Sequence, residues 1–218
     1  MQYHDLKLIL ASQSPRRRQL IADLNLPFEC ISTNSDESTA ETKPDMTAID
    51  ISRKKALWAF DNKQINDNEV IIGADTIVVF NDRILGKPKS DDDARKMLNL
   101  LSGKTHSVYT GVTFIWKSST PPKQSDCRDN IISYITVSQD SFICIKSFAE
   151  KTGVTFQQIT AEEIEAYIDT KDHKDKAGSY GIQGPFSLHI PAICGDYNNV
   201  VGFPLARIYK ELKALCAF

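Results

Sequence analysis

The segment at residues 11–18 combines small polar residues with consecutive arginines. It reads Ala-Ser-Gln-Ser-Pro-Arg-Arg-Arg and follows an apolar run at 7–11 that is typical of a buried strand. Ser14 is a good N-cap and Pro15 suits the first helical position, so a helix should begin here. A helix N-terminus attracts anions, and arginines in its first turn are suited to phosphate. The segment is a candidate phosphate site; the alternative is a solubilising basic turn.

A carboxylate interrupts the longest β-prone stretch of the chain. Residues 69–80 are rich in β-forming side chains, and Gly73-Ala74-Asp75-Thr76 breaks this run. Burying an unpaired carboxylate is costly, so Asp75 must be paired, bind a metal or line a cleft. The structural alternative is a strand-end aspartate at a bulge beside Gly73.

Two further segments are weaker candidates. In Gly86-Lys87-Pro88 the proline restricts Lys87 to an extended backbone, although such a tripeptide is commonly just a turn. The segment 175–184 reads Asp-Lys-Ala-Gly-Ser-Tyr-Gly-Ile-Gln-Gly, and its glycines permit close backbone approach to a ligand. Its composition alone favours a flexible loop. His106 lies in a strand-like segment and is better explained as a hydrogen-bonded structural residue than as a metal ligand.

The elements that must position these residues form a mixed α/β pattern. Ser90, followed by three aspartates, indicates a helix start, and Gly103 is a good residue to end that helix. Thr160 and Glu163 form a capping box. The other expected elements are a helix over about 47–61, a hairpin turn at Asn81-Asp82, long β segments over about 106–116 and 131–148 joined by the polar loop 118–130, a helix end near Ile168, a charged Gly-rich loop over 169–184, and a helix from Pro204.

Bulk composition excludes several classes of protein. The chain has 218 residues, 41% hydrophobic and 25% charged, with a net charge of −2, which does not favour general binding to nucleic acid or anionic membranes. The five cysteines are scattered without a Cys-x-x-Cys pair, which argues against a disulfide framework or zinc ribbon. No apolar stretch approaches the roughly 18 residues of a membrane span. We therefore expect a soluble, cytoplasmic protein.

In order and spacing, these segments together resemble the Maf family of nucleoside triphosphate pyrophosphatases. The resemblance runs from about residue 7 to 212. Its motifs are Ala-Ser-x-Ser-Pro-Arg-Arg from residue 11, Lys55-Ala56, Gly-Ala-Asp-Thr from 73, Gly-Lys-Pro from 86, Leu-Ser-Gly-x-x-His-x-Val from 101, the 175–184 loop, and Asn-Asn-Val-Val-Gly-Phe-Pro-Leu from 198.

The resemblance implies an elongated two-lobed α/β fold related to the inosine triphosphate pyrophosphatases. A long central mixed β-sheet would carry both lobes, with a cleft between them, and residues 1–218 would form one such domain. The chain departs from the family pattern in a longer loop at 118–130, in Phe203 where leucine is commoner, and in an irregular stretch at 185–195.

The activity implied is hydrolysis of a pyrimidine nucleoside triphosphate, dTTP or UTP, to the monophosphate and pyrophosphate. By the match, Asp75 is the proton acceptor, Glu37 a second catalytic carboxylate and Lys87 a catalytic cation. Asp75 and Glu37 would also hold Mg²⁺ or Mn²⁺, because these hard cations prefer oxygen ligands. The residues expected to bind substrate are Ser12, Arg16, Arg17, Lys55, Thr76, Lys176 and Gln183. The cluster of basic side chains explains how an acidic protein can bind a polyanion.

The assignment to a subfamily depends on the sequence Gly-Ile-Gln-Gly at 181–184. It resembles the dTTP/UTP branch, whereas the branch acting on 7-methyl-GTP resembles Lys-Ser-Glu. Two alternatives stay open: a 7-methyl-GTP pyrophosphatase, and a non-enzymatic nucleotide-binding regulator of cell division, against which the retention of Asp75, Glu37 and Lys87 argues. The expected partner is a small-molecule nucleotide, with no stable nucleic acid and no membrane, and a homodimer is left open.

Overall fold

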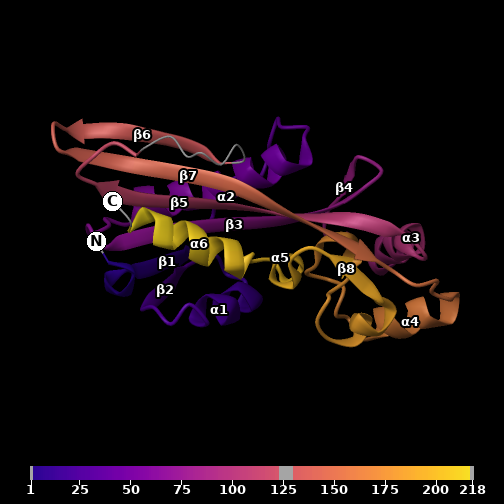
Figure 1. Ribbon diagram of the computed structural model, residues 1–218. Coiled ribbons are helices and arrows are strands. Elements are labelled where there is room, and N and C mark those ends of the chain that lie inside the picture. The colour runs from indigo at the N-terminus through magenta and orange to yellow at the C-terminus, as the bar shows by residue number, and fades with distance from the viewer. Residues whose placement is uncertain (1, 123–129, 217–218) are drawn as a thin grey trace. The chain divides into compact units, whose positions relative to one another are not determined.

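The computed structural model describes residues 2–122 and 130–216. The chain divides into two compact units. Unit 1 comprises Met1–Asp75, Thr110–Ala149 and Gly202–Phe218, and unit 2 comprises Thr76–Tyr109 and Glu150–Val201. Three long strands pass from one unit into the other: β3 (Glu69–Phe80), β5 (Thr105–Ser118) and β7 (Ser141–Thr155) (Figure 1).

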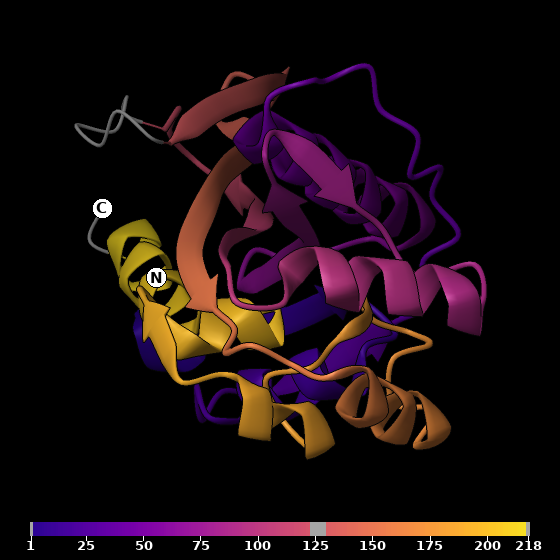
Figure 2. The same ribbon diagram turned by 90° about the vertical axis from the view of Figure 1, so that its right-hand side faces the viewer.

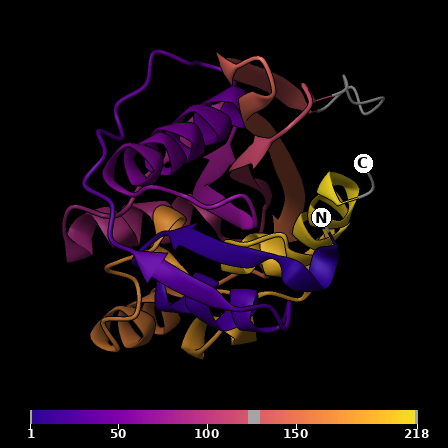
Figure 3. The same cartoon turned by 90° about the vertical axis from the view of Figure 1, so that its left-hand side faces the viewer.

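The strands belong to one mixed sheet with the order β2-β1-β3-β5-β7-β6, in which β4 also pairs with β3 and β8 with β7. In unit 1, β1 (Lys7–Ala11) lies between β2 (Phe28–Ile31) and β3, parallel to both, as Figure 3 shows for β1 and β2. The predicted strand at 7–11 is confirmed. Ala11 is paired with Gly73, so the segment after β1 begins near the middle of β3. This register brings two of the sequence motifs together.

One face of the unit 1 sheet is covered by α1 (Pro15–Ala22) and α6 (Leu205–Leu215). The predicted start of α1 is confirmed, because the Ser14 hydroxyl accepts a hydrogen bond from the Arg17 amide and Pro15 occupies the first turn. Even-numbered residues of β1 and β3 point to this face, as the period of a strand requires. The core here contains Leu8, Leu10, Ile21, Val70, Ile72, Phe114, Phe148, Phe203, Ile208 and Leu212.

Helix α2 (Pro44–Asn62) covers the opposite face and begins earlier than the predicted residue 47. It lies unusually close to the sheet. A Cβ added to Gly73 would be 2.2 Å from the Ser52 carbonyl oxygen, and one added to Gly111 would be 2.1 Å from that of Ala48. The Ser52 hydroxyl also bonds to Thr113 on β5, at 2.9 Å. The absence of side chains at two strand positions therefore sets the distance between α2 and the sheet.

Strand β3 is continuous from Glu69 to Phe80, so Asp75 lies within the apolar strand and not at a strand end. On one side of β3 the pairing with β1 reaches Gly73, and on the other side its neighbour in the sheet is β5. Because side chains alternate along a strand, Asp75 lies on the same face as Gly73, the face that α2 covers. The carboxylate is therefore aimed at α2.

Replacing Gly73 by alanine should destabilise the protein and lower its activity, because the new methyl group must displace the α2 backbone. Overpacking of this kind costs roughly 1–3 kcal/mol. Equilibrium urea unfolding measures the loss. Gly86→Ala is the control, since no atom of the described residues lies within 4 Å of an added Cβ there. Equal free energies of unfolding for the two variants would show that α2 can move away from the added methyl group without loss of stability.

The longest helices of unit 2 are α3 (Asp91–Leu101) and α4 (Ala161–Asp169), shown in magenta and orange in Figure 2. Both predicted helix starts are confirmed: the Ser90 hydroxyl accepts from the Asp93 amide, and Thr160 and Glu163 form the capping box. Gly103 has the positive φ of 68° that ends α3. The core of this unit contains Val78, Leu98, Leu101, Val108, Phe156, Ile164, Tyr167, Tyr180 and Phe186.

The hairpin from β3 into β4 (Arg83–Leu85) turns at Asn81-Asp82 as predicted, both residues having positive φ. The expected strand over 131–148 is wrong: the chain reverses at 139–140 to form β6 (Ile131–Ser138) antiparallel to β7. Of the loop predicted at 118–130, residues 123–129 lie outside the described residues. The remaining elements are β8 (Ala192–Cys194), α5 (Tyr197–Val201) and short 3-10 helices at Tyr3–Asp5, Ala177–Ser179 and Pro185–His189. Within residues 2–122 and 130–216, no helix combines the length and apolar character needed to cross a bilayer.

Candidate active site

Two carboxylates in unit 1 converge on one buried ammonium group. Lys55, on α2, places its Nζ 2.6 Å from Asp75 Oδ1 and 2.9 Å from Glu37 Oε1. The side chains of Lys55 and Asp75 are 10% and 14% exposed, whereas that of Glu37 is 59% exposed. The requirement that a carboxylate within β3 be paired is therefore met by Lys55. We call these three residues the carboxylate–lysine centre.

The segment after β1 forms a second cluster in the same unit. The Ser12 hydroxyl accepts hydrogen bonds from the Ser14 amide, at 3.2 Å, and from Arg17 Nη1, at 3.3 Å. Arg17 Nε donates to the Gly202 carbonyl oxygen at 2.8 Å. These contacts fix the direction of the guanidinium. The helix start and the sequence Ser-Pro-Arg-Arg thus act together to orient Arg17.

The two clusters of unit 1 are coupled electrostatically. Burial lowers the pKa of the Arg17 guanidinium, while the negative charges of Asp75 and Glu37 act to raise it and the positive charge of Arg16 adds to the lowering. Both arginines and both carboxylates therefore belong to one electrostatic environment. Such a mixture of fixed positive and negative groups can bind a polyanion and also accept a proton.

A polar cavity of about 370 Å³ adjoins the Ser12 segment at the carboxyl ends of β1 and β2. In sheets with parallel strands, ligands commonly bind outside the carboxyl ends of those strands. The cavity is lined by Ser12, Gln13, Ser14, Arg18, Cys30 and Ser32.

In unit 2 the Gly86-Lys87-Pro88 segment meets the 175–184 loop. The Gly178 amide donates to the Gly86 carbonyl oxygen at 3.0 Å. Gly178 has φ +69°, and a Cβ there would lie 3.0 Å from the side chain of Val78, so only glycine fits comfortably. The exposed Lys87 therefore sits on a backbone that is tied to the glycine-rich loop.

Lys176 lies inside this loop and is neutralised by neighbouring carboxylates. Its Nζ is 2.9 Å from Asp172 Oδ1 and 2.8 Å from Asp175 Oδ1. Its aliphatic chain runs beneath Gly181, where an added Cβ would lie 2.9 Å from Lys176 Cε. The side chain of Gln183 is exposed, two residues further along. The loop therefore presents the glutamine outward while it holds the lysine within.

Tyr180 anchors the same loop in an aromatic cluster. Its hydroxyl is 2.7 Å from His106 Nε2, and its ring packs edge-on against Phe156. Burial lowers the pKa of His106 to about 4, and burial raises the pKa of Tyr180. Both groups are therefore neutral at pH 7. As its sequence context indicated, His106 has a structural role, fixing the loop to β5.

The ten predicted site residues are divided between the two units. Ser12, Arg16, Arg17, Glu37, Lys55 and Asp75 lie together in unit 1, whereas Thr76, Lys87, Lys176 and Gln183 belong to unit 2. Thr76 directly follows Asp75 on β3. The sequence analysis missed the Gly202 carbonyl as a partner of Arg17, and Asp172 and Asp175 as partners of Lys176. A backbone carbonyl has no side-chain signature, but the spacing from Asp172 to Lys176 is an ordinary one for an ion pair and signals the second contact.

The donor set of the carboxylate–lysine centre fits a divalent cation. One oxygen of Asp75 and one of Glu37 lie 2.6 Å and 2.9 Å from the same ammonium nitrogen, so both carboxylates face a position that favours positive charge. Within the part of the chain that the structure describes, no three His, Cys, Asp or Glu side chains gather at one place. Mg²⁺ does not require a larger set, because it is usually held by one or two carboxylates, with waters and substrate phosphates completing its shell.

Comparison with known proteins identifies the family of this chain. Residues 7–215 match the family described as Maf-like protein. A dTTP/UTP pyrophosphatase of Agathobacter rectalis is 41% identical over 96% of this chain and 97% of its own length. Proteins with the same description from Bacillus cereus and Lachnoclostridium phytofermentans are 42% and 40% identical, each over 95% of this chain and 94% of its own length. This chain is therefore a member of the Maf family.

Proposed function

We propose that this protein is a nucleoside triphosphate pyrophosphatase that hydrolyses dTTP and UTP to the monophosphate and pyrophosphate. The observation that carries the proposal is the convergence of Asp75 and Glu37 on Lys55, in the same electrostatic environment as Arg16 and Arg17. The descriptions of the curated relatives, which match nearly the whole chain, support the same activity.

In the proposed mechanism Asp75 accepts a proton from the attacking water. The water oxygen forms a bond to the α-phosphorus, and the bond from that phosphorus to the oxygen bridging to the β-phosphate breaks. Pyrophosphate leaves with the electron pair of the broken bond. Lys55 holds the Asp75 carboxylate in place at 2.6 Å, and an oriented base of this kind is what proton transfer in a transition state requires.

The arginine–serine cluster supplies charge for the phosphates. Arg17 is held by Ser12 and by the Gly202 carbonyl, so its guanidinium needs little reorganisation to meet an oxyanion. Asp75 and Glu37 are the residues that would hold Mg²⁺ or Mn²⁺, which would neutralise phosphate charge when bound. Lys87 and Lys176 are the other two basic residues proposed to bind the phosphates.

Base selection is assigned to Gln183, with Arg16 and Thr76 as supporting residues. Uracil and thymine present an N3–H donor beside carbonyl acceptors, and a glutamine amide offers one acceptor and one donor. A flipped amide would also match cytosine, so neighbouring groups must lock its orientation. A 7-methylguanine edge offers two donors and carries positive charge, which suits glutamate better.

A panel of nucleotides assayed for pyrophosphate release with Mg²⁺ tests this function. We expect kcat/KM for dTTP and UTP to exceed those for CTP, GTP and 7-methyl-GTP by about tenfold or more, because unpaired polar groups penalise the wrong base. Gln183→Glu should reduce this preference by placing a charge against a carbonyl oxygen. Gln64→Glu, at another exposed glutamine, should leave it unchanged.

The outcomes of the panel separate the rival functions. If 7-methyl-GTP were the best substrate, the subfamily assignment would be wrong while the reaction type stood. If no nucleotide were hydrolysed but UTP still bound, the non-enzymatic regulator would replace the enzyme.

We also propose a cytoplasmic location and a homodimer. Four cysteines in the described residues, Cys30, Cys144, Cys194 and Cys216, are free thiols, which suits a reducing compartment. For the dimer, β6 is the outermost strand of its side of the described sheet, and Tyr134, Ile135 and Val137 on it are exposed. Uncharged, apolar edge strands are templates for pairing with another chain, and an antiparallel pair of identical strands is self-complementary.

A further inference from the structure

The segment that follows α4 contains a residue in a costly backbone conformation. Lys171 has φ 60°, in the left-handed region where glycine or asparagine is usual at a helix end. Its amide donates to the Ile168 carbonyl at 3.0 Å and so closes the end of α4. A lysine at this position needs a compensating contact, and its side chain makes one.

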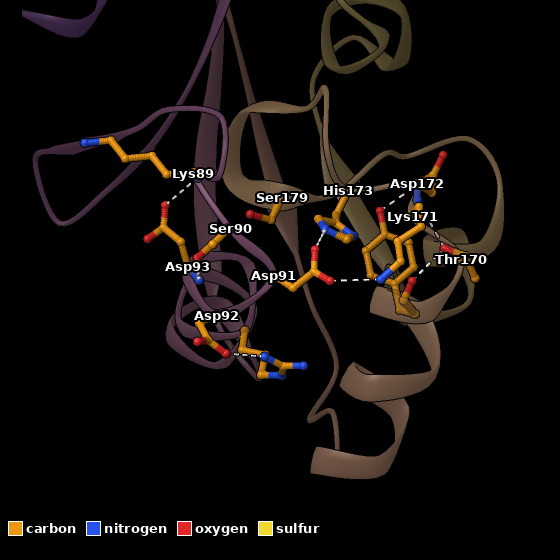
Figure 4. A network of polar contacts seen from close by, with 12 residues as sticks. Lys89, Ser90, Asp91, Asp92, Asp93, Thr170, Lys171, Asp172, His173 and Ser179 are labelled. Atoms are coloured by element: carbon orange, nitrogen blue, oxygen red, sulfur yellow. Dashed lines mark hydrogen bonds and ion pairs between the residues drawn. The ribbon is translucent and has the colours of Figure 1, made fainter.

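Lys171 and His173 both bind Asp91, the first residue of α3 (Figure 4). Lys171 Nζ donates to Asp91 Oδ2 at 2.8 Å, and His173 Nε2 lies 3.0 Å from Asp91 Oδ1. Each carboxylate oxygen therefore serves one residue of the segment. The hydrogen bonds and charges of Lys171 and His173, in that order, lower the pKa of Asp91, so it is ionised at neutral pH.

His173 connects Asp91 to the interior of the segment that contains Lys176. Its side chain is only 1% exposed, and its buried Nδ1 has no hydrogen-bond partner among the described residues, so Asp91 provides the hydrogen bond of the ring. The His173 carbonyl accepts from the Lys176 amide at 3.2 Å, and the Lys176 carbonyl accepts from the Ser179 amide at 3.1 Å. A continuous series of contacts thus runs from Asp91 through His173 to Lys176.

We propose that Asp91 is a positioning residue for the segment 171–183, which contains Lys176 and Gln183, two of the proposed substrate contacts. The inference rests on the proposed function, since it treats those two residues as substrate contacts. Asp91 touches no reacting atom itself. Its carboxylate fixes the start of the segment, while the Gly178–Gly86 and Tyr180–His106 hydrogen bonds fix its later part.

The neighbouring aspartates allow this role to be separated from a general effect of charge. Asp91, Asp92 and Asp93 all lie in the first turn of α3, where each favours the helix dipole. Asp92 binds Arg95 on its own helix, and Asp93 accepts a hydrogen bond from the Lys89 amide. Only Asp91 of the three contacts the 171–183 segment in the contacts that the structure describes.

The experiment compares Asp91→Ala with Asp92→Ala in the full-length protein. Hydrogen exchange is measured at the amides of 171–180, and kcat and KM are measured for UTP and CTP. We expect Asp91→Ala to raise exchange in this segment, to raise KM for UTP roughly tenfold with a smaller change in kcat, and to reduce the UTP/CTP preference. Asp92→Ala should leave exchange in 171–180 unchanged and the kinetic constants within about twofold. Should Asp91→Ala fail to fold, Asp91→Asn replaces it, because it removes the charge and keeps the size.

Three results are decisive. Faster exchange together with a changed KM and UTP/CTP preference supports the proposal. Equal behaviour of the two alanine variants overturns it, as does faster exchange with an unchanged KM and preference, because Asp91 would then serve stability alone. Failure of the wild-type protein to hydrolyse any nucleotide would instead be a failure of the proposed function, and the exchange measurement would still report whether Asp91 holds the segment.

Discussion

Replacing Asp75 by asparagine should lower kcat for UTP by roughly 10³-fold, within the 10²–10⁴-fold that general acid–base catalysis contributes. The substitution keeps the size of the side chain and a carbonyl oxygen that can accept from Lys55, so the fold and UTP binding should persist. What the substitution removes is the carboxylate proposed to accept the proton. Steady-state kinetics of pyrophosphate release and a binding titration with UTP together measure the two effects.

Asp67→Asn makes the same chemical change at an exposed turn before β3 and serves as the control. It should retain the parent rate. If Asp75→Asn still hydrolysed UTP at a tenth of the parent rate, the base would have to be another group, and Glu37 is the first to examine because it shares the Lys55 ammonium.

Replacing Lys55 by methionine should reduce both stability and activity. Methionine fills a similar volume, but it leaves the largely buried Asp75 without its counter-ion. Removing one partner of a buried ion pair costs about 3 kcal/mol or more. Activity should fall by about 10²-fold, since the base loses the contact that orients it. Urea unfolding and kcat/KM for UTP measure the two losses.

The adjacent lysine provides a matched control. Lys54→Met removes a more exposed ammonium that pairs with Asp50 one helical turn away, and surface pairs contribute little. The double variant Lys55→Met with Asp75→Asn should regain part of the lost stability and none of the activity. If Lys55→Met were as stable and active as Lys54→Met, the Lys55 ammonium would contribute nothing to the stability of the protein or to its activity.

Local signals predicted the helix boundaries well. Ser14-Pro15 and the pair Thr160 and Glu163 specify their caps through bonds within one turn, so no distant residue is needed. The strand at 28–31 was missed because it is short and half-buried, and only its parallel register with β1 makes it a strand. The reversal at 139–140 was missed because Gln139-Asp140 is not one of the dipeptides that mark a two-residue hairpin, although Asp140 and the serines beside it favour turns.

The resemblance of the sequence to the Maf family identified the residues of the site. It did not predict which of these residues pair with one another. The sequence pattern required only that Asp75 have some partner. That the partner is Lys55, shared with Glu37, depends on how closely α2 approaches the sheet over Gly73 and Gly111. Such distances arise from packing between segments far apart in sequence, which local periodicity does not encode.

The hydrogen bond from Arg17 to the Gly202 carbonyl has a consequence for how the protein is made. Ribosomes deliver the chain from its N-terminus, and Arg17, which is proposed to bind phosphate, emerges long before its acceptor. Unit 1 itself is assembled from three separate stretches, the last beginning at Gly202. A nascent chain that stops short of this glycine has every acidic and basic group of the centre but not the carbonyl that aims Arg17. Arg17 therefore gains its fixed orientation only late in translation, and a prematurely terminated product lacks this contact.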